Sequence, residues 1–241
     1  KKLPLADVRG GFFVDCGWFW RRSSGHESPS TVPNPNAPPA LAGDGYPSLP
    51  RSVQRRARRP MRMEAFLHCA GCKKTLFSIE FEQQLRVCPH CGHHHRLSAQ
   101  KRIDITFDEG SFEVMDADLR SGNPLQFPDY QEKLEGAETK TGVFDSVVSG
   151  VAKLGGTTVC AAVADFGFMG GSMGSVAGEK VTRTLERGVD RKVPVVIFCA
   201  SGGARMQEGL LSLMQMAKTT AAVERCNENR VPFLCVFTDP T

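Results

Sequence analysis

The sequence lacks several features that mark common classes of protein. Its longest apolar run, Val193–Ala200, contains a proline and is far too short to cross a bilayer. No histidine follows His95, so a Ser-His-Asp hydrolase would have to recruit one from the first part of the chain. Neither glycine-rich turn continues as Gly-Lys-Ser/Thr or has the spacing G-x-G-x-x-G. These absences argue against a membrane span, a serine hydrolase and a typical nucleotide-phosphate loop.

Charge and proline are unevenly distributed along the 241 residues. The net charge is +4, yet residues 1–60 hold ten Lys or Arg against four Asp or Glu, and nine of the fifteen prolines. Such a segment buries too little apolar surface to offset the entropy of ordering it. We therefore expect residues 1–64 to form a disordered basic extension. A nucleic-acid-binding arm and an Arg-rich transit peptide are the functional alternatives.

Four cysteines have the spacing C-x2-C-x15-C-x2-C, which is typical of a zinc ribbon. Four thiolates fill a tetrahedral site, so the zinc is expected to be structural, holding residues 65–98, which lack a core of their own. Paired disulfides are disfavoured by the reducing cytosol that we expect, and redox-active pairs by the repetition of the motif. The expected ligands are Cys69, Cys72, Cys88 and Cys91.

The other cysteines and the basic residues of the ribbon are less informative. Cys16 has no assignment, whereas four later cysteines lie in apolar surroundings and are expected to be small buried hydrophobes. These four are Cys160, Cys199, Cys226 and Cys235. A basic face on the ribbon keeps nucleic-acid binding open. That face consists of Arg86, His90, His93–His95, Arg96, Lys101 and Arg102.

From about residue 141, strands alternate with glycine turns and helices. The expected strands are Gly156–Phe166, Val193–Ala200 and Val231–Thr238, and amphipathic helices follow the first two. This repeat predicts an α/β layered domain with parallel strands. In the first helix, a stripe through Leu185 faces the core and Lys180 faces solvent. In the second helix, the expected core stripe consists of Leu210, Leu213, Met214, Ala217 and Ala221. The methionines Met206, Met214 and Met216 are expected to pack in the core or an interface.

The two glycine-rich turns are the candidates for chemistry. Gly202 and Gly203 lie between a strand and the start of a helix, where free N–H groups favour an anion. Without a Cβ, these residues also let a ligand oxygen approach the backbone, as in an oxyanion hole. Ordinary turn chemistry is the alternative for any single Gly-Gly pair.

The motifs then resemble a specific family. The ribbon cysteines, F-M-G-G-S-M-G-S-V, S-G-G-A-R-M-Q-E-G, L-M-Q-M-A-K-T and T-D-P-T together resemble the β subunits of bacterial and plastid acetyl-CoA carboxylase carboxyltransferase, from about Ala65 to Thr241. The resemblance implies a crotonase-like (ClpP/crotonase) α/β domain over residues 99–241, preceded by the small four-cysteine zinc ribbon. It also implies transfer of a carboxyl group from carboxybiotin to acetyl-CoA, giving malonyl-CoA for fatty acid synthesis.

The resemblance assigns roles to residues of the two turns. Gly202 and Gly203 are expected to stabilise the thioester enolate or a related oxyanion. Gly170 and Gly171 are expected to line the same site, and Arg205 to fix the helix start or bind the phosphates of CoA. Because family members continue past T-D-P-T, the catalytic domain is expected to be incomplete, and the chain alone to be inactive.

The resemblance also implies cofactors and partners. Biotin is expected on a biotin carboxyl carrier protein, beside a biotin carboxylase and a carboxyltransferase α subunit in an α2β2 arrangement, and ATP binding only at the level of the complex. The expected location is the cytoplasm, with the plastid stroma as the alternative. Two other functions are kept: a related acyl-CoA carboxyltransferase or decarboxylase subunit, and a zinc-ribbon nucleic-acid binder.

Overall fold

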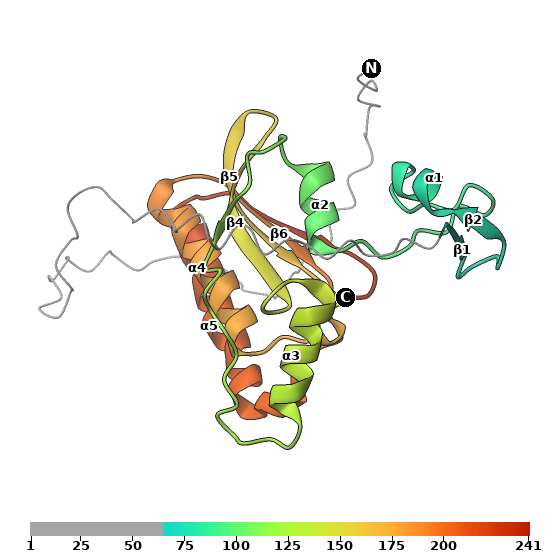
Figure 1. Cartoon of the computed structure of the whole chain (residues 1–241). Helices are drawn as coiled ribbons and strands as arrows, with labels where there is room; N and C mark the ends of the chain where they lie inside the picture. Colours follow the sequence, from blue (N-terminus) through green and yellow to red (C-terminus); the bar gives the residue numbers. More distant parts are fainter. Residues whose placement is uncertain (1–64) are drawn as a thin grey trace, which may run out of the picture. The chain divides into compact units, whose positions relative to one another are not determined.

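The computed structural model describes residues 65–241, so the expected disordered extension over residues 1–64 lies outside the described residues. The described chain forms a small two-stranded unit and a five-stranded sheet with helices (Figure 1). The elements of the small unit are β1 Phe66–His68, β2 Thr75–Phe77 and α1 Ser78–Gln83. The remaining elements are α2 Ala99–Thr106, β3 Glu113–Met115, α3 Tyr130–Thr141, β4 Val147–Leu154, β5 Thr157–Ala164, η1 Met169–Gly171, α4 Ser175–Arg191, β6 Val195–Cys199, η2 Met206–Glu208, α5 Leu210–Glu228 and β7 Phe233–Phe237.

The large sheet has the strand order β3-β4-β5-β6-β7 and is mixed. Strands β5, β6 and β7 are parallel, as the repeated strand–turn–helix pattern predicts. Strands β3 and β4 are antiparallel to their neighbours, so the expectation of parallel strands holds for only three of the five. The β4–β5 hairpin turns at Gly155 and Gly156, which both have positive φ, at 58° and 83°. Two positive φ values in a two-residue loop suit the twist of a hairpin. The sequence analysis did not use the Gly155-Gly156 pair to predict this hairpin.

Both faces of the sheet are covered. Helices α4 and α5 pack on one face around Leu185, Val195 and Cys226, and α2 packs on the other around Ile103 and Phe107. Figure 1 shows the sheet between these two layers. Alternate residues of β5 therefore enter different cores, which explains why this strand is apolar on both sides.

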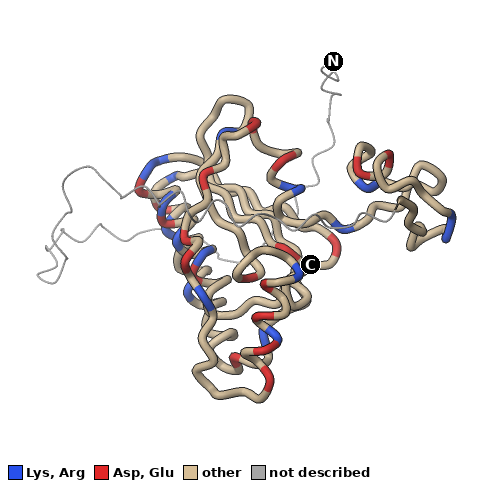
Figure 2. Tube along the Cα trace, viewed as in Figure 1, with Lys and Arg blue, Asp and Glu red and all other residues tan. Residues whose placement is uncertain are grey.

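Helix α4 carries several Lys and Arg residues (Figure 2), but one of them points inward. The prediction that Lys180 faces solvent is wrong, because its side chain is only 4% exposed. Its ammonium Nζ donates a hydrogen bond to the carbonyl of Val147 on β4 at 3.0 Å. Burial lowers the pKa of Lys180, and the nearby charge of Asp145 opposes that shift. A long stem that crosses the apolar layer allows the ammonium to reach this carbonyl.

Helix α5 forms where the sequence predicts it, but with a different buried face. The five residues of the expected core stripe are exposed, whereas Ser212, Gln215, Ala222 and Cys226 are buried. A Cβ at Gly178 on α4 would lie only 2.4 Å from Oε1 of Gln215. Gln215 therefore packs in the space that this glycine leaves. The face of α5 that packs on α4 is therefore partly polar, with Ser212 and Gln215 in addition to Ala222 and Cys226. Met206, Met214 and Met216 are exposed. The prediction that they pack in the core is therefore wrong, and the alternative, that they pack in an interface, stays a prediction. No helix within residues 65–241 is long and apolar enough to cross a membrane.

Two helical glycines give a matched test of this packing. A Cβ at Gly188 would lie 2.2 Å from Cγ2 of Val195, whereas a Cβ at Gly136 would meet no atom within 4 Å. We expect Gly136→Ala to raise the free energy of unfolding by about 0.5–1 kcal/mol. Gly188→Ala should lower it by about 1–3 kcal/mol, because the buried β-branched neighbour cannot yield. Denaturant unfolding measures both changes, and equal effects of the two substitutions would contradict the packing.

Candidate functional site

The two predicted glycine turns lie against each other at the carboxyl ends of β5 and β6. The N–H of Gly202 donates to the carbonyl of Gly170 at 2.9 Å, and the N–H of Met173 donates to the carbonyl of Gly203 at 2.8 Å. A Cβ at Gly171 would lie 2.3 Å from the carbonyl oxygen of Ala200, so this contact requires glycine. The structure thus brings together the four glycines that the sequence analysis singled out. Such edges of open α/β sheets are common ligand sites.

The two N–H groups expected to form an oxyanion hole have different partners. The N–H of Gly202 is used in the bond between the turns. The N–H of Gly203 donates to the hydroxyl of Ser201 at 3.0 Å, at an exposed position. Gly203 has a φ of 109°, and a Cβ there would meet no atom within 4 Å. The Gly203 N–H is therefore bonded to a side chain of its own turn, whereas the Gly202 N–H is bonded to the neighbouring loop.

Arg205 is buried beneath these turns, with no exposed side-chain surface. Its Nη1 and Nη2 donate to the two carboxylate oxygens of Asp145 at 2.8 and 3.2 Å. Its Nη2 also donates to the carbonyl of Ser172 at 2.7 Å. The structure therefore corrects one expected role of Arg205, because no part of its guanidinium is accessible to a CoA phosphate. Its contacts agree with the other expected role, which is to fix the start of the following helical segment.

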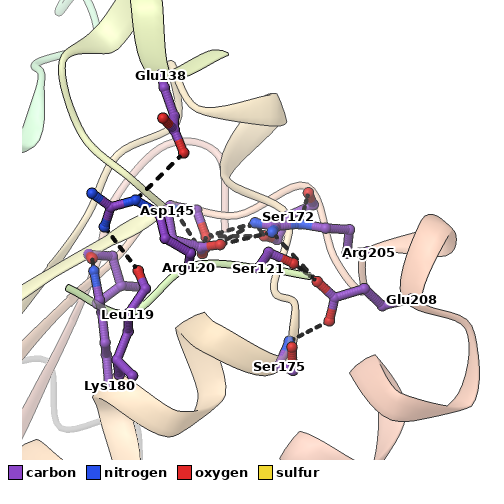
Figure 3. Close-up of polar contacts among 12 residues, drawn as sticks. Leu119, Arg120, Ser121, Glu138, Asp145, Ser172, Ser175, Lys180, Arg205 and Glu208 are labelled. Atoms are coloured by element: carbon purple, nitrogen blue, oxygen red, sulfur yellow. Dashed lines mark hydrogen bonds and ion pairs between the residues drawn. The ribbon is translucent and has the colours of Figure 1, made fainter. Parts of the chain in front are cut away.

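A second buried charge, Glu208, completes the network shown in Figure 3. Its Oε1 accepts hydrogen bonds from Tyr130 at 2.7 Å and from the hydroxyl of Ser121. Its Oε2 accepts from the N–H of Ser175, the first residue of α4, at 2.5 Å. The Nη1 of Arg205 lies 3.8 Å from Oε1. Glu208 was missed in the sequence, although its spacing from Arg205 within A-R-M-Q-E was a usable signal.

The surroundings favour the charged forms of Glu208 and Arg205, two of the three buried charges of the network. Burial opposes ionisation of Glu208, but hydrogen bonds from Ser121, Ser175 and Tyr130 outweigh it and lower the pKa of this carboxyl. Burial likewise opposes the charge of Arg205, but Asp145 raises the pKa of the guanidinium above its ordinary value. Burial also raises the pKa of Tyr130, which therefore remains a hydrogen-bond donor. These shifts favour a carboxylate at Glu208, a guanidinium cation at Arg205 and a neutral hydroxyl at Tyr130.

The four ribbon cysteines converge as their spacing predicts. Their sulfurs all lie within 4.8 Å of one another, with Cys69 and Cys91 separated by 3.7 Å and Cys72 and Cys88 by 3.8 Å. A tetrahedron with Zn–S bonds of about 2.3 Å places its sulfurs about 3.8 Å apart. The donor set and its spacing therefore fit one zinc ion. The apolar core of the ribbon is small: Leu76 and Phe81 are buried with Cys69 and Cys88, and Cys72 packs against them.

Two of these thiols have pKa values that are shifted in opposite directions. A hydrogen bond from the Cys72 backbone, helped by other donors, lowers the pKa of Cys69 to about 5. At Cys91, burial and the three neighbouring sulfurs outweigh a backbone bond from His93 and raise the pKa to about 12. A cation would relieve this crowding of sulfurs, because zinc binds cysteine as thiolate.

The remaining cysteines divide into two groups. Cys160 and Cys226 are buried, as expected of small hydrophobes. Cys199 is half-buried and Cys235 is exposed, so the expectation is wrong for Cys235. Their sulfurs lie 3.4 Å apart on neighbouring strands. Cys16 lies outside the described residues.

Comparisons with known proteins agree with this geometry. Residues 93–241 match the family model described as carboxyl transferase domain, and residues 66–91 match the acetyl-CoA carboxylase zinc finger domain. The chain is 46% identical over 195 residues to the acetyl-coenzyme A carboxylase carboxyl transferase subunit beta of Desulforamulus reducens, covering 81% of this chain and 68% of the relative. It is 47% identical to the protein of that name from Pelobacter propionicus, covering 79% and 68%.

A solved structure gives similar support for the fold. The transcarboxylase 12S structure with methylmalonyl-coenzyme A and methylmalonic acid bound superposes with a TM-score of 0.50 at 30% identity. The match covers 59% of this chain and 26% of that chain. The expected crotonase-like α/β class with a cysteine zinc ribbon is thereby confirmed.

Removal of one ribbon sulfur tests the metal site. We expect the wild-type chain to carry about one zinc and Cys72→Ser to lose it, because three thiolates leave the tetrahedral site open. The matched control is Cys235→Ser, which removes an exposed sulfur outside the cluster. Metal analysis of the purified proteins measures the content. Equal zinc in both variants would contradict the assignment.

The lowered pKa of Glu208 predicts an acid-dependent loss of stability. A carboxyl whose pKa is lower in the folded state than in the unfolded state stabilises the fold above the unfolded value, about 4.3 for glutamate. That contribution disappears as the pH falls through the folded pKa. We expect the difference in unfolding free energy between wild type and Glu208→Gln to be largest near neutral pH and to shrink in acid. Denaturant unfolding across pH measures it, with the exposed Glu228→Gln as control. A difference that does not vary with pH would refute the linkage.

Proposed function

Because the chain belongs to the carboxyl transferase family, we propose that it works as the β subunit of an acetyl-CoA carboxylase carboxyltransferase. In this role it helps to transfer a carboxyl group from carboxybiotin to acetyl-CoA, giving malonyl-CoA. The observation that carries the proposal is the exposed Gly203 turn, held against the Gly170–Gly171 loop at the carboxyl ends of parallel strands. The carboxyl transferase and zinc finger matches, which together span residues 66–241 apart from one position, support it.

The proposed chemistry follows from what a glycine turn can offer. Removal of a proton from the acetyl group places negative charge on the thioester oxygen, and a fixed N–H donor stabilises that charge. We assign this donor to Gly203, whose N–H is bonded only to the exposed Ser201 hydroxyl. Gly202 contributes by joining the turn to Gly170, and Gly171 by allowing close approach to Ala200. Carboxybiotin, carried by a partner protein, would release its carboxyl group as CO2. The biotin left behind would accept the acetyl proton, and the enolate carbon would bond to the CO2 to give malonyl-CoA.

The substrate class and the zinc have separate support. The transcarboxylase structure of similar fold holds methylmalonyl-coenzyme A, which favours an acyl-CoA as the substrate here. The four cysteine sulfurs, all within 4.8 Å of one another, favour one structural zinc per chain. Such an ion stabilises the ribbon and takes no part in the transfer, since four thiolates leave no open coordination position.

The proposed partners are the carboxyltransferase α subunit, the biotin carboxyl carrier protein and biotin carboxylase, in the cytoplasm. An exposed apolar surface favours a protein partner. It extends from η2 along α5, and Met206 at one end is 81% exposed. The other large exposed hydrophobic residues of this surface are Leu210, Leu211, Leu213, Met214 and Met216. Several large exposed hydrophobic residues on one segment commonly mark an interface. The chain spans about two thirds of the length of the first relatives that it matches.

A substitution at Gly203 tests the proposal. We expect Gly203→Val to lower the rate of malonyl-CoA formation at least about a hundredfold, because a β-branched residue at this positive φ displaces the N–H donor. The assay uses a chain of the relatives' full length with the α subunit, carboxybiotin and acetyl-CoA. Gly155→Val is the matched control, since Gly155 also has positive φ and open space but lies in the β4–β5 hairpin. An unchanged rate in Gly203→Val would remove the assignment.

A further inference from the structure

The proposed chemistry leaves Glu208 unexplained. Its carboxylate is completely buried and touches no surface on which a substrate could bind. Nevertheless, it accepts hydrogen bonds from three separate segments: Ser121 after β3, Tyr130 on α3 and Ser175 at the start of α4. A buried charge is costly unless it is fully bonded, so this arrangement requires an explanation.

The space for Glu208 is provided by another glycine. A Cβ at Gly174 would lie 2.7 Å from Oε1 of Glu208, so the carboxylate fits only because that side chain is missing. In this position it accepts the Ser175 N–H, one of the N–H groups that an α-helix leaves without a partner at its N-terminus. The positive end of the helix dipole favours the negative charge. The protein's own carboxylate therefore occupies this end of α4.

Arg205 makes the matching connection on the other side of the same short segment. Its guanidinium bonds Ser172 and Asp145, and its backbone N–H donates to the carbonyl of Met173 at 2.9 Å. The 205–208 segment is thus connected to residues 172–175 at both of its ends (Figure 3). These two segments directly adjoin the Gly203 turn and the Gly170–Gly171 loop. Glu208 therefore adds a side-chain connection between the segments that adjoin the two turns, beside the direct backbone bonds between the turns.

We propose that Glu208 is a positioning residue, whose hydrogen bonds fix the Gly203 N–H relative to the Gly170–Gly171 loop during carboxyl transfer. This inference rests on the proposed function. A misplacement of about 1 Å at a reacting centre can cost about a hundredfold in rate. Because Glu208 acts from the buried side of the turn, its loss should reduce turnover rather than acyl-CoA binding.

The test compares three single variants in the full-length chain, assembled with the α subunit and assayed with carboxybiotin and acetyl-CoA. Glu208→Gln removes the charge with almost no change in shape, and Tyr130→Phe removes one of its donors. Glu228→Gln is the matched control, because Glu228 is an exposed acid at the end of α5. We expect Glu208→Gln to lower kcat about 10–100-fold with KM changed less than about threefold. Tyr130→Phe should have a smaller effect in the same direction.

A double variant and a stability control separate positioning from a merely structural role. The kcat of Tyr130→Phe/Glu208→Gln should fall by less than the product of the single effects, since both act through one carboxylate. All rates are measured well below each variant's melting temperature. A folded Glu208→Gln protein with wild-type kcat, or with only KM changed, overturns the proposal. If that variant does not fold, Tyr130→Phe decides by the same criteria.

Failure of the proposed function has a different signature. If Gly203→Val abolishes activity but Glu208→Gln and Tyr130→Phe do not, the function stands and the positioning role is wrong. If the wild-type assembly forms no malonyl-CoA, the function is wrong and the positioning role with it.

Discussion

The buried guanidinium of Arg205, between the carboxylates of Asp145 and Glu208, is the interaction on which the arrangement of the site depends. Removing charges from water costs several kcal/mol for each ion, and only good geometry with further hydrogen bonds recovers that cost. Here the bidentate pair with Asp145 and the bonds to Ser172 supply both. Loss of one partner would leave an unpaired buried charge, at a cost of about 3–5 kcal/mol. The network is therefore stable only when all of its segments are in place.

Because of this requirement, the buried and the exposed residues of the site have different roles. The buried charges determine where the backbone of the two turns lies, whereas the exposed turn presents an N–H without a side chain in the way. The glycines differ accordingly. Gly171 makes room for the carbonyl of Ala200, and Gly174 makes room for Glu208. Gly203 has open space around it and is special only through its φ of 109°. The same residue type thus serves packing in two places, and in the third it leaves the space for the ligand that we propose.

Sequence reasoning identified the local features of this site but not the network beneath it. The cysteine spacing, the strands and the glycine turns are local patterns, because each depends on residues close together in the chain. The partner of Arg205, in contrast, lies sixty residues earlier, and no spacing rule connects Arg205 to Asp145. Helical periodicity defines faces by polarity and therefore puts Lys180 outside. A carbonyl on β4 nevertheless attracts its ammonium inward. On α5, periodicity found the helix, but the missing Cβ of Gly178 determines which face is buried.

In the ribbon, groups of like charge also lie close together, but a different cation would neutralise them. Its core contains few hydrophobic side chains, and four sulfurs take the place of a larger apolar cluster. Burial and the neighbouring sulfurs raise the pKa of Cys91, whereas hydrogen bonds lower the pKa of Cys69. A metal ion would bind all four as thiolates. In the sheet domain, the guanidinium of Arg205 neutralises the carboxylates of Asp145 and Glu208, as zinc would neutralise the thiolates. Arg205 thereby connects segments that are distant in the sequence, and a metal ion bound by the four cysteines would do the same in the ribbon.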